Sequence, residues 1–179
     1  MASSRNPDRL ILPVNDHDHF QGGSTASITL VQYGDYQCPG CQMAHGILPF
    51  IQQQLGNQIR FVFRHFPLHP EAYHAAEAAE AAASQQKFWE MHSHLFENQT
   101  NLTDSYLVEY AIALALDVNQ FLHEMTTDYH VARVQADIDS GLQSGVIRTP
   151  TFFINGLKFN DDRSLEALLE ALVQANYEP

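Results

Sequence analysis

Residues 28–41 read ITLVQYGDYQCPGC, and this stretch predicts both a local fold and a chemistry. Residues 28–33 form a short apolar run rich in β-branched side chains, ended by a glycine and an aspartate, which predicts a buried strand. A helix begins directly afterwards, because Pro39 stands at the first helical position that proline favours. Cys38 and Cys41 therefore lie at a strand-to-helix turn.

The spacing of Cys38 and Cys41 favours a redox-active pair. Residues three apart in the first helical turn face the same side, so the two sulfur atoms come within reach of one disulfide. Cys38 also faces unpaired backbone N–H groups and the positive end of the helix dipole, which lower the pKa of a thiol. Such a pair suits thiol–disulfide exchange, in which Cys38 attacks a disulfide and Cys41 resolves the mixed disulfide.

An inert buried disulfide and half of a zinc site are the two alternatives for this pair. A structural zinc site normally has four ligands, and the chain has no further cysteine. Histidines would have to complete the site, and His45 is the nearest candidate on the same helix. We expect no metal.

The segments that flank the cysteines predict a strand–helix–strand unit. Residues 59–64 alternate in the manner of a second strand, and a helix between two such strands implies that they run parallel. The helix is expected to end at Gly56. Its predicted inward-facing side chains are Met43, Ile47, Leu48, Ile51 and Leu55.

The rest of the chain divides into a helical and a mixed part. Between Pro70 and Gly145 no comparable strand pattern occurs, and helices are predicted near residues 75–83, 88–96, 106–114, 117–125 and 129–141. Strands return at 151–154 and 157–159, joined by an Asn-Gly turn, and an amphipathic helix at 165–173 follows. We therefore expect an N-terminal arm at 1–27, an α/β domain formed by 28–69 and 145–179, and a helical insertion at 70–144.

Size and charge exclude several classes of partner. The 179 residues suit one domain with an insertion, and the net charge of −12 disfavours binding to a nucleic acid or an anionic membrane surface. No apolar run is long enough for a membrane span. The first residues lack the apolar core of a signal peptide, so we expect a cytoplasmic location, or a periplasmic one if a leader has been removed. The Asp16–His19 cluster is expected to be a solvated tip.

Several segments resemble the DsbA-like oxidoreductases of the thioredoxin superfamily, whose active sites read Cys-Pro-x-Cys. The resemblance covers most of residues 28–175 and is carried by YGDYQCPGC at 33–41, HFPLHP at 65–70, KFWEMH at 87–92 and GVIRTPTFFING at 145–156. It implies an α/β thioredoxin-like fold with an inserted all-helical subdomain. The branch of small bacterial domains fits best, and some of these occur fused behind membrane transporters.

The resemblance also implies a role for Thr149 and Pro150. In thioredoxin folds the matching proline is cis and lies against the cysteine pair, and the residue before it pairs with an extended substrate through backbone hydrogen bonds. From composition alone, Pro150 would only be a proline at the start of a strand. Arg148 is a further candidate, because it could place a cation near Cys38.

Two positions depart from the family pattern. Many relatives carry an acidic residue six positions before the first cysteine, where this chain has Gln32, which cannot titrate. Asp35 is closer in sequence, but we expect it at the exposed end of the strand. The strongly oxidising relatives carry histidine where this chain has Gly40, so the thiolate of Cys38 should be less stabilised and the disulfide less oxidising.

The sequence thus predicts a thiol–disulfide oxidoreductase that needs no metal or organic cofactor. Its expected substrates are protein or peptide thiols and disulfides, with a redox partner protein or glutathione to reset the Cys38–Cys41 pair. A glutathione-linked transferase or isomerase on the same fold is one alternative, with its pocket near Thr149 and Pro150. A non-catalytic binding module is the other. Oxidases, reductases and isomerases share these residues, and the partner redox system sets the direction of the reaction.

Overall fold

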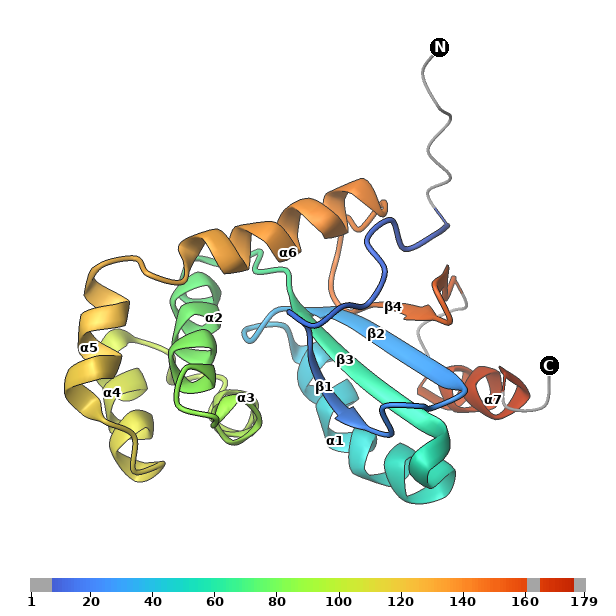
Figure 1. Cartoon of the computed structure of the whole chain (residues 1–179), viewed down its shortest axis with the longest axis horizontal. Coiled ribbons are helices and arrows are strands. Elements are labelled where there is room, and N and C mark those ends of the chain that lie inside the picture. The colour runs from blue at the N-terminus through green and yellow to red at the C-terminus, as the bar shows by residue number, and fades with distance from the viewer. Residues whose placement is uncertain (1–7, 161–164, 176–179) are drawn as a thin grey trace, which may run out of the picture.

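A mixed sheet of five strands runs through the part of the chain that our computed structural model describes, residues 8–160 and 165–175 (Figure 1). The strand order is β1-β3-β2-β4-β5. Strands β2 and β3 are parallel, and the other neighbouring pairs are antiparallel. The bounds are β1 His19–Gly22, β2 Ile28–Gly34, β3 Ile59–His65, β4 Thr151–Ile154 and β5 Leu157–Lys158.

The predicted strand–helix–strand unit is confirmed. Helix α1, Pro39–Leu55, connects β2 to β3, which pair in parallel from Ile28 opposite Ile59 to Gly34 opposite His65. One inward-facing residue was wrongly predicted, because the side chain of Met43 is 60% exposed. The small side chain of Ala44 takes the buried position instead, one residue along the helix.

Helices fill the segment between β3 and β4, as the alanine-rich and amphipathic patterns predict. They are α2 Pro70–Ala83, α3 Phe88–Glu97, α4 Asp104–Ala113, α5 Val118–Thr126 and α6 Val131–Gln143. Helices α2 to α5 gather beside the sheet, and α6 runs from them back across it (Figure 1). The segment thus returns the chain to the sheet immediately before the Thr149-Pro150 pair.

Helix α6 lies very close to one face of the sheet. The hydroxyl groups of Tyr33 on β2 and Ser140 on α6 are 2.8 Å apart and share a hydrogen bond. A Cβ atom on Gly141 would stand 2.8 Å from the ring of Phe66 and 3.0 Å from that of Tyr33. Only glycine allows this approach. The opposite face, which carries Phe61 and Phe63, packs against Trp89 and Phe96 of α3.

Part of the N-terminal arm joins the sheet, which the sequence did not predict. Strand β1 pairs antiparallel with β3. The expectation of a solvated tip at Asp16–His19 holds for Asp16 and His17, which are exposed, but is wrong for Asp18. Asp18 is 9% exposed and binds the guanidinium of the fully buried Arg64 through two contacts of 2.7 and 2.9 Å. A buried arginine needs a paired carboxylate, and the arm supplies it.

The C-terminal part forms a hairpin and a last helix. Asn155 and Gly156 connect β4 to β5 with positive φ angles of 49° and 80°, as an Asn-Gly turn requires. Helix α7, Leu165–Ala175, then buries Leu168 and Leu172 against the sheet domain. The side chain of Leu165, at the start of the predicted amphipathic helix, lies outside the described residues.

Candidate active site

The two cysteines lie where β2 gives way to α1. Cys38 is the N-cap residue, with extended backbone angles, and Pro39 occupies the first helical turn as predicted. Both thiols are free; the side chain of Cys38 is half-buried and that of Cys41 is fully buried. Solvent and an incoming disulfide can therefore reach only the first of the two sulfur atoms.

The surroundings of Cys38 stabilise its thiolate. Its pKa is lowered to about 5, chiefly by a hydrogen bond from the Cys41 side chain. Partial burial acts in the opposite direction, while the Thr149 side chain and the backbone N–H groups of Cys41 and Gly40 lower the pKa further. Cys38 is consequently a thiolate at neutral pH, the form that acts as a nucleophile.

Cys41 has the opposite electrostatic character. Burial raises the pKa of its thiol far above the usual range, and the interaction with Cys38 raises it further. The backbone N–H of Asp35 donates a weak hydrogen bond to its sulfur, at an N–S distance of 3.5 Å. Cys41 therefore keeps its proton while Cys38 is ionised.

Thr149 and Pro150 lie against this pair. The Thr149–Pro150 peptide bond is cis, as the family resemblance implies, and the Thr149 carbonyl oxygen is 3.3 Å from Cys38 Sγ. Gly40 faces the proline ring, where a Cβ atom would stand 3.0 Å from Pro150 Cδ and 3.7 Å from Cys38 Sγ. The glycine keeps the active-site turn close to the proline.

Asp35 is not at an exposed strand end, so that expectation is wrong. Its side chain is buried, and its carboxylate accepts hydrogen bonds from Gln37 N at 2.6 Å, Leu68 N at 2.7 Å and His69 Nδ1 at 2.8 Å. The hydrogen bond from Gln37 N closes a local turn, of the kind in which an aspartate side chain accepts from the backbone N–H two residues later. The bonds to the β3–α2 loop come from residues more than 30 positions away, which no local pattern reveals.

Gln32 is also buried, on β2, and its Nε2 atom has no hydrogen-bond partner among the residues that the structure describes. A Cβ on Gly34 would stand 3.2 Å from that nitrogen, so the amide lies in a tightly packed region. An amide cannot exchange protons with a thiol at neutral pH. Gln32 thus offers Cys41 no titrating neighbour.

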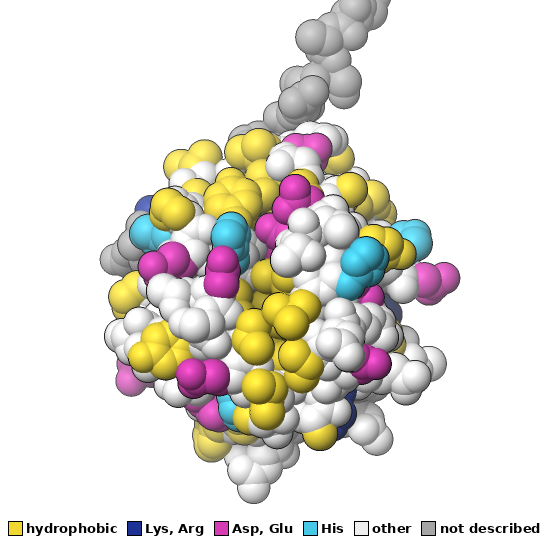
Figure 2. All heavy atoms as spheres, turned by 90° about the vertical axis from the view of Figure 1, so that its left-hand side faces the viewer, with side chains coloured by type: hydrophobic (Ala, Val, Ile, Leu, Met, Phe, Trp, Pro, Cys, Tyr) yellow, Lys and Arg dark blue, Asp and Glu magenta, His cyan; other side chains and the backbone are white. Residues whose placement is uncertain are grey.

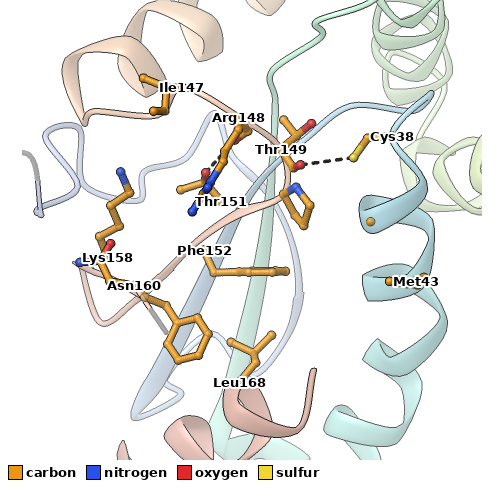
Figure 3. Close-up of a pocket in the computed structure, with 13 residues that line it drawn as sticks. Cys38, Met43, Ile147, Arg148, Thr149, Thr151, Phe152, Lys158, Asn160 and Leu168 are labelled. Atoms are coloured by element: carbon orange, nitrogen blue, oxygen red, sulfur yellow. Dashed lines mark hydrogen bonds between the residues drawn. The ribbon is translucent and has the colours of Figure 1, made fainter. Parts of the chain in front are cut away.

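A cavity of about 490 Å³ opens beside Cys38 (Figure 3). Arg148 lies at this cavity, but its charge is not among the main causes of the lowered pKa of Cys38. The sequence did not single out the lining residues Met43, Phe152, Lys158 and Leu168 as site residues. Phe152 belongs to the apolar run that predicts the strand at 151–154, whereas the position of Lys158 depends on the β4–β5 hairpin.

Residues 8–160 and 165–175 hold no group of three or more His, Cys, Asp or Glu side chains arranged to bind a metal ion. Within the same residues, no helix combines the length and apolar character needed to cross a membrane.

Comparisons with known proteins place the chain in a family. The family described as thioredoxin matches residues 14–174. The chain is 40% identical over 172 residues to the Na⁺/H⁺ antiporter NhaA 3 of Salinispora tropica and 38% identical over 157 residues to the NhaA antiporter of Herminiimonas arsenicoxydans. It covers 26% and 25% of those proteins, so it spans about a quarter of their length.

Solved structures share the fold at lower sequence identity. Oxidised BdbD from Bacillus subtilis superposes with a TM-score of 0.84 and 22% identity, over 93% of this chain and 96% of that one. The alpha-DsbA1 protein of Wolbachia pipientis gives a TM-score of 0.80 and 21% identity, over 94% of each chain. The chain therefore belongs to the thioredoxin family and has the fold of its DsbA-like members.

Proposed function

We propose that the chain is a thiol–disulfide oxidoreductase that acts on protein or peptide substrates through Cys38 and Cys41. The observation that carries this proposal is the difference in burial and acidity between the two sulfur atoms. Cys38 is half-buried with a pKa lowered to about 5, whereas Cys41 is buried with a strongly raised pKa. Cys38 can therefore attack as a thiolate, while Cys41 remains a protonated thiol that can later resolve the mixed disulfide.

The reaction follows from this arrangement in two exchange steps. The Cys38 thiolate attacks one sulfur of a substrate disulfide, the substrate S–S bond breaks, and the departing thiolate takes a proton from solvent. Cys41 then loses its proton, attacks Cys38 Sγ and releases the second substrate thiol. The substrate gains two electrons and the chain ends with a Cys38–Cys41 disulfide; the reverse sequence oxidises a dithiol.

The Cys38–Cys41 pair itself supplies the redox chemistry, so the proposed reaction needs no metal or organic cofactor. A redox partner protein or glutathione would return the pair to its starting state, and the poise of that partner sets the direction. We assign Thr149 to substrate positioning, because its carbonyl oxygen lies 3.3 Å from the nucleophilic sulfur, where an extended peptide would pass.

Two cysteine variants test the proposal. Cys38→Ser should abolish insulin reduction and oxidative refolding, because it removes the only accessible thiolate of the pair. Cys41→Ala should instead accumulate a mixed disulfide between Cys38 and substrate, visible by non-reducing electrophoresis and mass spectrometry, because nothing resolves it. Activity retained in Cys38→Ser would contradict the mechanism, and glutathione-conjugating activity in that variant would favour a transferase.

A further inference from the structure

The cavity beside Cys38 carries an unusual charge for this molecule. The chain has 21 acidic and 9 basic residues, yet the described residues that line the cavity include Arg148 and Lys158 and no aspartate or glutamate. Elsewhere the surface is different: the face around α4 and α5 shows Asp, Glu and His side chains and little Lys or Arg (Figure 2). A positive patch next to the nucleophile therefore contrasts with an acidic molecule.

Within residues 8–160 and 165–175, neither Arg148 nor Lys158 forms an ion pair with a carboxylate, whereas Arg64, Arg133 and Lys87 each do. Arg148 is exposed. Lys158 Nζ donates one hydrogen bond to the Gly145 carbonyl oxygen at 2.7 Å, and an ammonium group has two further protons to donate.

Apolar side chains separate one of the two cations, Lys158, from the sulfur. In Figure 3, Phe152 lies between Lys158 on one side and Cys38 and Met43 on the other, with Leu168 below it, while Arg148 lies next to Thr149. Met43 is 60% exposed, so its thioether is accessible to a bound chain. A ligand that crosses the cavity from Cys38 toward Lys158 passes apolar side chains before it reaches the ammonium group.

We propose that this cavity selects substrates in which the reactive cysteine is followed by an apolar residue and then by a carboxylate. The inference rests on the proposed function and names its substrate class. The apolar side chain would cover Phe152 and Leu168, and the carboxylate would lie between Arg148 and Lys158. The occupant is an acidic peptide segment of a protein substrate.

Among the described residues, the Asp8 carboxylate lies at the outer limit of the patch. The Asp8 carboxylate accepts a hydrogen bond from Asn160 Nδ2 at 3.3 Å, at the end of the cavity lining that follows Lys158 in sequence. A second substrate carboxylate beyond Lys158 would approach this group. The favourable charge is therefore confined to the space near the two cations.

Two disulfide-closed peptides that differ at one position provide the test. Both peptides contain the sequence Cys-Leu-x, in which the cysteine supplies the attacked sulfur. The residue x is glutamate in one peptide and lysine in the other. The reduced protein should react up to about fivefold faster with the glutamate peptide at low ionic strength, because a solvent-exposed ion pair contributes up to about 1 kcal/mol, which corresponds to that ratio. Added salt should reduce the ratio.

Substitutions in the cavity should remove this preference. Arg148→Gln and Lys158→Gln should each lower the rate with the glutamate peptide severalfold and leave the lysine peptide unchanged or faster. Lys87→Gln is the matched control. Lys87, at the N-terminus of α3, has a side chain that is 41% exposed and pairs with Glu90, and it does not line the cavity. The pKa of Cys38, measured by alkylation, should not change in Arg148→Gln, which separates an effect on the substrate from one on the nucleophile.

Binding to the Cys38→Ser variant separates this inference from the proposed function. Linear forms of the two peptides should bind with the same order of preference, even if exchange activity were absent. Equal rates and equal affinities for the two peptides would overturn the inference while leaving the oxidoreductase intact. The inference would also be overturned if oxidised glutathione reacted faster than the glutamate peptide and its rate depended on Arg148 and Lys158 in the same way. The two cations would then serve to bind glutathione.

Discussion

Asp35 and Cys41 are joined through the backbone: the Asp35 N–H donates to Cys41 Sγ at 3.5 Å, while the Asp35 carboxylate accepts from the loop that follows β3. The residue whose N–H contacts the resolving sulfur is thus fixed by Leu68 and His69, more than 30 positions away. The geometry of the buried cysteine depends on this loop as well as on α1.

The first prediction concerns this anchor. Asp35→Ala should lower the free energy of unfolding of the reduced protein by about 2 kcal/mol, because the N–H groups of Gln37 and Leu68 lose their acceptor. It should also slow resolution of the mixed disulfide by Cys41. Urea unfolding and rapid-quench analysis of a single turnover measure the two effects.

His69→Ala is the matched control for Asp35→Ala. The His69 side chain is 53% exposed, and an exposed pair contributes less than about 1 kcal/mol. His69→Ala should therefore lower the free energy of unfolding much less than Asp35→Ala does. An unfolding free energy in Asp35→Ala equal to that of the wild type would show that the carboxylate is not a structural anchor.

The second prediction concerns the acidity of Cys38. Alkylation by iodoacetamide should be fast and independent of pH above about 6, and should fall as the pH drops through about 5, where the thiolate becomes protonated. Cys41→Ala should shift this profile to higher pH, because the largest contribution to the lowered pKa is the hydrogen bond from Cys41. A profile unchanged by this substitution would assign the low pKa to the helix terminus alone.

The same pKa has a consequence for stability. A thiol whose pKa is lower in the folded state than in the unfolded chain stabilises the folded state above the folded-state pKa. The reduced protein should therefore become more stable between pH 5 and 8 and lose this contribution as the pH falls through about 5. Chemical unfolding of wild type and Cys38→Ser across this range measures the difference.

The third prediction concerns Gly40. The wild-type pair should have a reduction potential below about −120 mV, the value of a strongly oxidising member. Gly40→His should raise it by about 30 mV or more, a tenfold change in the equilibrium constant, because a nearby cation stabilises the Cys38 thiolate. Gly40→Ala adds only a Cβ, 3.0 Å from Pro150 Cδ, and separates crowding from charge. Titration against glutathione buffers gives all three potentials.

The fourth prediction concerns Glu80 on α2. Burial alone would raise the pKa of this carboxyl, but hydrogen bonds from His19 and His65 outweigh burial and hold the pKa well below its usual range. Glu80→Gln should cost about 3 kcal/mol at neutral pH, because it removes the buried carboxylate that is hydrogen-bonded to the buried His65 and the partly buried His19. Glu90→Gln, at an exposed pair, should cost less than about 1 kcal/mol.

The sign of the pH effect provides a second readout for Glu80. Because its pKa is lower in the folded state, the stabilisation is present above the unfolded value of about 4.3 and is lost as the pH falls below it. The wild type should therefore lose stability between pH 5 and 3 more steeply than Glu80→Gln. Identical slopes would show that Glu80 is not the titrating group.

Local patterns were sufficient for the backbone of the redox site. The apolar run of β2, the proline after Cys38 and the Asn-Gly turn each act over a few residues, and each element formed where it was predicted. Buried polar residues were not predictable in this way. Asp18 and Asp35 look like solvated turn residues in sequence, and only their distant partners, Arg64 and Leu68, explain their burial.

Local sequence patterns also fail to predict which residues line the cavity. Lys158 lies on a hairpin 120 positions after Cys38, and its place in the lining follows from the order of the strands rather than from any motif. Met43 fits the apolar period of α1, but the side of the helix that it occupies is left open beside the cavity. Periodicity identifies an apolar face without showing whether another element covers it.

The close approach at Gly141 has a consequence for motion. Because α6 contacts the rings of Tyr33 and Phe66 through a glycine and bonds to the sheet through Ser140, it cannot slide along the sheet without breaking packed contacts. The helices on one side and the strands on the other should therefore reorient together, as one body. Adaptation to substrates of different shape would then fall to the loops around Cys38 rather than to a hinge between two halves.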